Sequence, residues 1–301
     1  MVVDCAIIGG GPAGLNAALV LGRARRNVML FDDNQPRNAV TQESHGFLTR
    51  DGVKPDEFRN IAHQEISTYP SVEIRHTRIT DVSNHESSFE LVANDGAVFH
   101  ARTIILATGL KEILPAIDGI HDYYGKSLFG CPYCDGWELR DKALVIIAEN
   151  EMVASHMPKV VYNWSRDIVV CTNGHSVLGV EQKEFLRTYA IQVVEEKIVA
   201  LRGEDGQLER IVFEDQKEIK RTGGFVGTQL LQASSFGALL GCDLNALGGP
   251  VTDQFGRTSV KGVYAAGEMV AAAPSHLIMA AAQGSMAAVG VNTDLTQSEF
   301  L

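Results

Sequence analysis

The chain has 301 residues and carries 26 basic against 37 acidic side chains, for a formal net charge of −11. Hydrophobic residues make up 45% of it and charged residues 21%, which is typical of a globular α/β protein with room for two domains. The negative charge repels phosphate backbones and argues against a nucleic-acid partner. No apolar run is long enough to span a membrane and the N-terminus shows no secretory signal, so we expect a cytoplasmic protein that binds no membrane.

The first 33 residues read as a strand, a glycine turn, a helix and a second strand. Gly9, Gly11 and Gly14 give the spacing G-x-G-x-x-G between the first strand and the helix. In this pattern the first glycine permits the tight turn, the second lets the backbone approach a pyrophosphate, and the third allows close helix–strand packing. Asp32 and Asp33 end the second strand, where an acidic side chain accepts hydrogen bonds from ribose hydroxyls. The segment predicts a dinucleotide site with the helix N-terminus facing the phosphates.

Further along the chain, a β-rich stretch is expected over residues 72–106 and ends in TIILATG. A second strand–helix–strand unit begins near Ala143, and a block of small residues leads into an alanine-rich helix from about residue 275 to 291. We predict an α/β protein with two Rossmann-like dinucleotide-binding domains, the second inserted into the first. The expected boundaries are 1–114 and 241–301 for the first domain and 115–240 for the central domain.

The segment Cys131-Pro-Tyr-Cys134-Asp135-Gly136 is the most informative stretch of the sequence. A structural zinc site needs a second ligand pair, and the other three cysteines are isolated, so we expect no metal. A glutaredoxin also carries Cys-Pro-Tyr-Cys, but near the start of a small fold whose later elements are missing here. The proline, glycine and aspartate around the pair indicate a turn rather than a core. A redox-active disulfide is therefore favoured over two buried, inert thiols.

The order of these motifs, together with ATG at 107–109 and YAAG at 264–267, resembles the low-molecular-weight thioredoxin reductases over nearly the whole chain. This class belongs to the pyridine nucleotide-disulfide oxidoreductases. The segments FDDNQPRN and HGFLTRDG are closer to a subgroup that contains the fungal dithiol oxidases and related bacterial flavoproteins. The resemblance implies FAD as the cofactor, a homodimer, and a thioredoxin-like protein or a small-molecule disulfide or dithiol as the partner.

The resemblance also implies roles for individual residues. Cys134 would lie next to the flavin, Cys131 would attack the partner disulfide, and Asp135 would be the acid–base residue. Glu268 stands where the family usually has aspartate, and the N-terminus of the last helix, with Ser275 and His276, would point at the flavin. The residues expected to bind FAD are Gly9, Gly11, Pro12, Ala13, Gly14, Asp32, Asp33, Arg37, Asn38, His45, Thr108, Gly109, Gly267, Glu268, His276 and Leu277.

The central domain departs from the family pattern at two places. Where the family has the glycine fingerprint G-G-G-x-S-A for NADPH, residues 147–152 read IAENEM. These side chains block the close approach of a pyrophosphate, and Glu149 and Glu151 add negative charge. The next strand ends in CTNG at 171–174, where the family has two arginines that hold the 2′-phosphate. Ordinary NADPH binding is therefore not expected.

The source or destination of the flavin electrons consequently stays open between several hypotheses. Reduced ferredoxin or flavodoxin could supply them, which is the interpretation we favour. A dithiol oxidase would instead pass electrons from a dithiol substrate through FAD to oxygen. An NADPH-dependent reductase with a disguised nucleotide site and a non-enzymatic flavin–disulfide redox sensor are the remaining alternatives.

Overall fold

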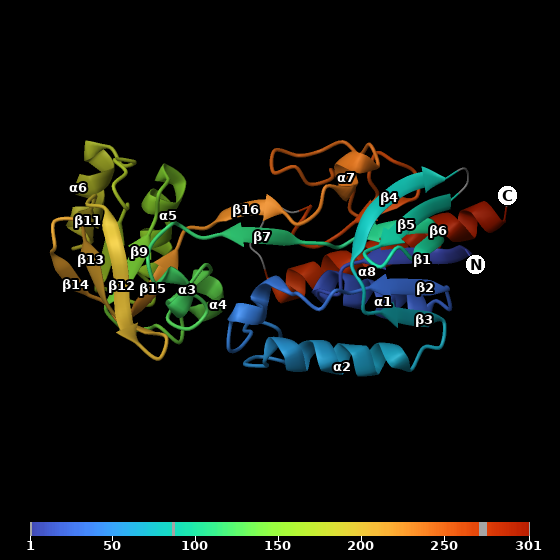
Figure 1. Cartoon of the computed structure of the whole chain (residues 1–301), viewed down its shortest axis with the longest axis horizontal. Coiled ribbons are helices and arrows are strands. Elements are labelled where there is room, and N and C mark those ends of the chain that lie inside the picture. The colour runs from blue at the N-terminus through green and yellow to red at the C-terminus, as the bar shows by residue number, and fades with distance from the viewer. Residues whose placement is uncertain (1, 86–87, 271–275, 301) are drawn as a thin grey trace. The chain divides into compact units, whose positions relative to one another are not determined.

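The computed structural model describes residues 2–85, 88–270 and 276–300 (Figure 1). The chain divides into two compact units. The first contains residues 1–39, 46–111 and 230–301, and the second contains residues 40–45 and 112–229. Among the described residues, no helix combines the length and the apolar character that crossing a bilayer requires.

The described part of the first unit contains a seven-stranded sheet in the order β3-β2-β1-β6-β5-β4, with β17 also paired to β6. Its strands are β1 (Val2–Ile8), β2 (Val28–Phe31), β3 (Val72–Arg75), β4 (Ile79–His85), β5 (Ser88–Ala93), β6 (Val98–Leu106) and β17 (Val263–Ala265). The first three strands, β6 and β17 run parallel, whereas β4 and β5 form an antiparallel meander with the first half of β6. Carboxyl ends of parallel strands meet at one edge of a sheet, which is where α/β proteins bind nucleotides.

The parallel strands of this sheet are buried on both faces, which explains their continuous apolar runs. The helices of the unit are α1 (Pro12–Arg23), α2 (Pro55–Ser67), α7 (Phe236–Leu239) and α8 (Leu277–Glu299). On one face, Ile7 and Ile105 pack with residues of α1, α2 and α8. On the other face, Ile8 and Leu106 pack with the meander and α7.

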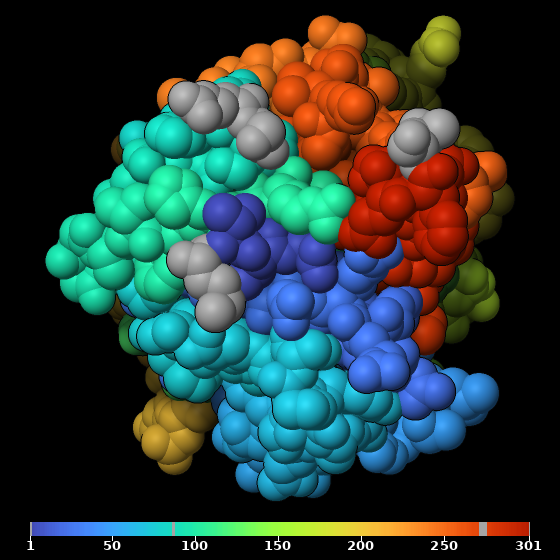
Figure 2. Space-filling model, turned by 90° about the vertical axis from the view of Figure 1, so that its right-hand side faces the viewer, coloured from blue at the N-terminus to red at the C-terminus, as the bar shows by residue number. Residues whose placement is uncertain are grey.

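Helix α8 packs against α1 and ends at Glu299, near the start of strand β1. It ends eight residues beyond the predicted position, because Leu295 is buried in the core and Glu299 forms ion pairs with Arg26 and Arg102 (both 2.7 Å). Figure 2 shows this end of the unit, where the start of the chain in dark blue meets the red helix and the green strands.

The second unit is built on a parallel sheet in the order β11-β10-β9-β15-β8. Its strands are β8 (Leu128–Phe129), β9 (Leu144–Ile147), β10 (Ile168–Cys171), β11 (Gln192–Val194) and β15 (Gly223–Val226). An antiparallel sheet of β12 (Ile198–Glu204), β13 (Gln207–Phe213) and β14 (Glu218–Lys220) packs on one face. The helices are α3 (Ile120–Tyr123), α4 (Pro132–Asp135), α5 (Glu151–Val161) and α6 (Val180–Thr188). Helices α5 and α6 cover the other face of the parallel sheet. They lie on the same face because α5 connects β9 to β10, α6 connects β10 to β11, and both connections run in the same direction along the sheet.

The predicted α/β class with two Rossmann-like units is confirmed. Two of the four places where the chain passes between the units lie in β7 (Leu110–Ile113) and β16 (Gln229–Gln232), which pair as a two-stranded sheet. Residues 230–240, which we assigned to the central domain, lie in the first unit, because Phe236 and Leu240 are buried in its core. Residues 40–45 lie in the second unit, although we assigned them to the first domain.

Candidate functional site

The glycine turn between β1 and α1 depends on the absence of side chains. Gly9 has φ +117°, and a Cβ atom there would lie 2.2 Å from the carbonyl oxygen of Ala107. A Cβ atom on Gly14 would lie 1.8 Å from the carbonyl oxygen of Gly9, because the helix packs directly on the turn. Both glycines are therefore needed to fold the turn itself.

Gly11 differs from the other two glycines, since a Cβ atom there would meet no atom of the described residues within 4 Å. It is the N-cap of α1, with Pro12 as the first helical residue and no acidic side chain in the first turn. The amide groups of a helix N-terminus attract anions. Gly267 borders the same turn, because its Cβ would lie 3.0 Å from that of Ala13. This arrangement fits the pyrophosphate of FAD.

The two aspartates after β2 differ in their surroundings. Asp32 is buried and forms an ion pair with Arg59, and it also accepts a hydrogen bond from the Asn34 N–H (2.9 Å). Asp33 is more exposed and accepts a hydrogen bond from Arg78 Nε (2.8 Å). Both carboxylates have partners within the protein, but Asp33 is the more accessible to a ligand because its side chain is 31% exposed, against 5% for Asp32. It lines an open pocket with Gln35, His76, Thr77, Arg78 and Asn94.

Glu268 is held by an arginine from the other end of the chain. Arg37 Nε donates to Glu268 Oε2 (3.0 Å), and a second bond joins Arg37 Nη2 to Glu268 Oε1 (2.5 Å). Next to it, the Gly267 N–H donates to Gln283 Oε1 of α8 (3.0 Å). The sequence prediction assigned both Arg37 and Glu268 to FAD, but it did not pair them and it missed Gln283. A bidentate pair fixes the direction of the longer glutamate side chain.

The remaining predicted FAD residues lie at the ends of elements of the first unit, with one exception. Thr108 follows β6 and shares a hydrogen bond with Ser234 Oγ (2.9 Å), while Gly109 adopts a positive φ of 68°. Asn38 lies in the 3-10 turn Arg37–Val40, and His276 and Leu277 are the N-cap and first residue of α8. Ser275 lies outside the described residues. The exception is His45, which belongs to the second unit.

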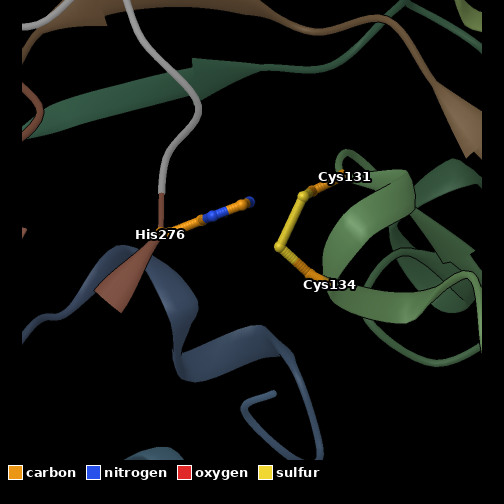
Figure 3. Close-up of side chains that lie close together, drawn as sticks. All are labelled: Cys131, Cys134 and His276. Carbon is orange, nitrogen blue, oxygen red and sulfur yellow. A yellow bond between two sulfur atoms is a disulfide. The ribbon is translucent and has the colours of Figure 1, made fainter. Parts of the chain in front are cut away.

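Cys131 and Cys134 are joined by a disulfide at the start of the short helix α4, with Cα atoms 5.3 Å apart (Figure 3). Figure 3 also marks His276 at the start of α8. Both cysteines are partly exposed, and Tyr133 between them is 63% exposed. Gly136 is buried against Trp164, whose ring would lie 2.8 Å from an added Cβ atom. The disulfide is thus partly exposed, on a turn that is held in place where Gly136 packs against Trp164.

Asp135 follows the disulfide directly and is only 8% exposed. Burial of its carboxyl group raises the pKa of Asp135 to about 7, while His45 lowers it and Glu138 raises it. His45 Nε2 lies 3.8 Å from Glu138 Oε1, so a histidine and two carboxyl groups gather beside the cysteines within the second unit. A group with a pKa near neutral pH can both give and take a proton, which suits the predicted acid–base role.

The other three cysteines are buried thiols in the described structure. Burial raises the pKa of Cys5 and of Cys171 to about 12, and it also raises the pKa of Cys242. A thiol with a raised pKa forms little thiolate, which is the reactive species. These residues are therefore unreactive under native conditions.

The N-terminus of α5 is occupied by the side chains of the protein itself. Asn150 caps the helix, since its side chain accepts a hydrogen bond from the Val153 N–H (2.9 Å). Glu149 accepts a hydrogen bond from Asn173 Nδ2 (2.6 Å), and Glu151 accepts one from Gln182 Nε2 (2.9 Å). The two segments that depart from the family pattern are thus joined to each other by a hydrogen bond.

Comparison with known proteins agrees with this geometry. The family model for pyridine nucleotide-disulphide oxidoreductases matches residues 3–284. The chain belongs to this family. As a pyridine nucleotide-disulphide oxidoreductase it is similar to TrxB of Bacillus anthracis, described as a thioredoxin reductase, with a TM-score of 0.95 and 47% identity over 99% of both chains. Thioredoxin reductase tcpT of Claviceps purpurea is 31% identical over 98% of this chain and 96% of its own. For the Helicobacter pylori thioredoxin reductase the identity is 29%, over 96% of this chain and 98% of its own.

The predicted resemblance to the thioredoxin reductases is therefore confirmed, and the chain is an FAD-dependent disulfide oxidoreductase of this class. Several residues at the site were not predicted from the sequence, namely Arg59, Arg78, Ser234 and Gln283. Each of these residues contacts its partner from a distant segment of the chain, so no local sequence pattern predicts the contact.

Proposed function

We propose that the enzyme transfers electrons between FAD and the disulfide of a thioredoxin-like protein or a small molecule through Cys131 and Cys134. We further propose that its electron donor is a reduced ferredoxin or flavodoxin rather than a nicotinamide nucleotide. The closed N-terminus of α5 carries this second proposal, because a pyrophosphate would have to bind there.

Three features oppose a nucleotide at α5. The helix amide that would bind phosphate already donates to Asn150. Glu149 and Glu151 would face the phosphate with like charge, which costs about 4 kcal/mol per unit-charge pair at 4 Å near a protein surface. Moving either carboxylate aside breaks a charge-assisted hydrogen bond, to Asn173 or Gln182, worth about 1.5–3 kcal/mol. For each carboxylate one cost or the other applies, and with two carboxylates the total is a substantial part of the roughly 8 kcal/mol that corresponds to micromolar binding.

The exchange step uses the chain's own sulfur atoms. FAD held by the first unit would, once reduced, provide the two electrons that together with two protons convert the Cys131–Cys134 disulfide to a dithiol. The Cys131 thiolate then attacks one sulfur of the partner disulfide, which forms a mixed disulfide and releases a partner thiolate that takes up a proton. The Cys134 thiolate attacks the Cys131 sulfur and releases the second partner thiolate. The partner gains two electrons and two protons, and the Cys131–Cys134 disulfide forms again.

Asp135 is suited to accept and donate the protons of this thiol–disulfide exchange. Its carboxyl group lies next to Cys134 in the sequence, and its raised pKa of about 7 leaves both protonation states populated near neutral pH. It can accept a proton when a cysteine ionises and return it to a departing thiolate.

The donor proposal is tested by anaerobic titration of the purified yellow protein, with the visible absorbance of the flavin as the readout. NADPH and NADH are expected to leave the flavin oxidised, whereas reduced flavodoxin or ferredoxin bleaches it. Dithionite serves as the control that shows the flavin is reducible. Rapid, stoichiometric bleaching by NADPH would reject the proposal and identify an NADPH-linked reductase.

A further inference from the structure

An exposed group of aromatic and basic side chains covers neighbouring parts of α5 and α6 in the second unit. This aromatic–cation surface consists of Lys159, Tyr162, Arg166, Phe185 and Tyr189. Tyr189 packs edge-on against Tyr162, with ring centroids 5.4 Å apart, and also contacts Phe185 at 5.2 Å. Phe185 and Tyr189 are each 45% exposed, although large aromatic rings are normally covered.

The two cations of this surface stack on its rings instead of pairing with acids. The Arg166 guanidinium lies 3.9 Å from the Tyr162 ring centroid, and the Lys159 ammonium lies 5.0 Å from that of Phe185. Within the described residues, neither has a carboxylate at ion-pair distance. Asp167 follows Arg166 in the sequence and is paired with Arg221 (3.4 Å), and Glu184 precedes Phe185 and is paired with Arg187 (3.5 Å). The surface therefore presents net positive charge on a chain of net charge −11.

Trp164, a sequence neighbour of this surface, contacts the turn that carries the redox disulfide. Trp164 lies between Tyr162 and Arg166 in the sequence, and its ring packs edge-on against Tyr133 at 5.7 Å. Tyr133 is one of the two residues between Cys131 and Cys134. A protein that covers Tyr133 while it reacts with Cys131 can extend onto the aromatic–cation surface without leaving the second unit.

These features together are typical of a protein interface. Exposed tyrosine, tryptophan and arginine dominate binding energy at such surfaces, and stacked cations lose little side-chain freedom on binding. Unpaired positive charge selects a negative partner and accelerates its association. We propose that the aromatic–cation surface docks an acidic protein whose disulfide or dithiol exchanges with Cys131. This inference rests on the proposed function and specifies the partner of that same exchange.

The test removes both cations in the double variant Lys159→Gln/Arg166→Gln. The matched control, Lys197→Gln/Lys220→Gln, makes the same charge change near the antiparallel sheet on the opposite face of the unit. Each protein is reduced anaerobically with dithionite and mixed with an oxidised thioredoxin of net negative charge. Separate runs use 5,5′-dithiobis(2-nitrobenzoate), a small disulfide that needs no docking surface. The second-order rate constants are measured at low and high salt.

We expect the double variant to react about tenfold more slowly with thioredoxin at low salt and at the normal rate with the small disulfide. The control variant should react with thioredoxin at the wild-type rate. High salt should reduce the difference in rate between the wild type and the double variant. Equal thioredoxin rates for the wild type and the double variant would overturn the inference. The inference would also be overturned if the wild type reduced the small disulfide but not the acidic thioredoxin. In that case the proposed disulfide exchange through Cys131 would still be supported. Failure with both substrates would overturn the proposed function itself.

Discussion

Replacing Cys131 with serine is expected to abolish disulfide exchange while FAD stays bound. The residue lies in the second unit, outside the glycine turn of α1, so its loss removes the attacking sulfur without altering the cofactor site. Loss of a nucleophile typically lowers turnover by about 10³-fold or more. Activity is measured as reduction of an oxidised thioredoxin or a small disulfide, with dithionite-reduced enzyme as the electron source.

The matched control for this variant is Cys242→Ser, which changes a buried thiol that donates a hydrogen bond to Thr258 (3.5 Å). It should keep both its flavin and its exchange activity. Retention of substantial activity by Cys131→Ser would remove the assignment of Cys131 as the exchange thiol. A loss of flavin in the same variant would show that FAD binding by the first unit depends on Cys131 in the second unit.

The substitution Gly11→Val should eliminate FAD binding and leave the protein folded. A Cβ atom added at Gly11 would meet no atom of the described residues within 4 Å, and the backbone there has φ −78° and ψ −179°, which any residue adopts. The side chain would instead fill the space in front of α1 that the pyrophosphate needs. We expect affinity for FAD to fall about 10²-fold or more, which corresponds to about 2.7 kcal/mol. The measurement is the flavin content of the purified protein, with circular dichroism to verify the fold.

Gly179→Val provides the control for Gly11→Val, because Gly179 is also an extended N-cap glycine, at α6 in the second unit. Both variants exchange glycine for a poor N-cap residue, so both should lose a similar stability of about 1 kcal/mol. Only the variant at position 11 should lose its yellow colour. If Gly11→Val retains stoichiometric FAD, the pyrophosphate does not bind at this turn.

The strands that position the site were predictable because they are buried on both faces and read as unbroken apolar runs. β1, β9 and β10 were all expected from such runs, and the glycine spacing located the start of α1. Helix α2 was missed, although Pro55 at its first turn and the acids Asp56 and Glu57 are start signals for a helix. The Asn150 cap was also missed, although asparagine three residues before Val153 is a typical N-cap.

The side-chain pairs of the site could not be predicted, because their members are far apart in the sequence. Arg37 and Glu268 are separated by 231 residues, and Arg59 and Asp32 by 27. Which arginine meets which carboxylate depends on how the elements pack, and periodicity carries no information about that. The same holds for His45, whose position beside Glu138 follows from the path of residues 40–45 through the second unit.

The most direct test of the relay through Cys131 and Cys134 is a map of cysteine reactivity before and after reduction of the flavin. The oxidised and the dithionite-reduced proteins are treated anaerobically with iodoacetamide under native conditions, and the modified positions are identified by mass spectrometry. We expect modification at Cys131 and Cys134 only after reduction, and none at Cys5, Cys171 or Cys242 in either state. Reduced flavin with Cys131 and Cys134 still unmodified, or reduction-dependent modification of one of the buried cysteines, would contradict the account.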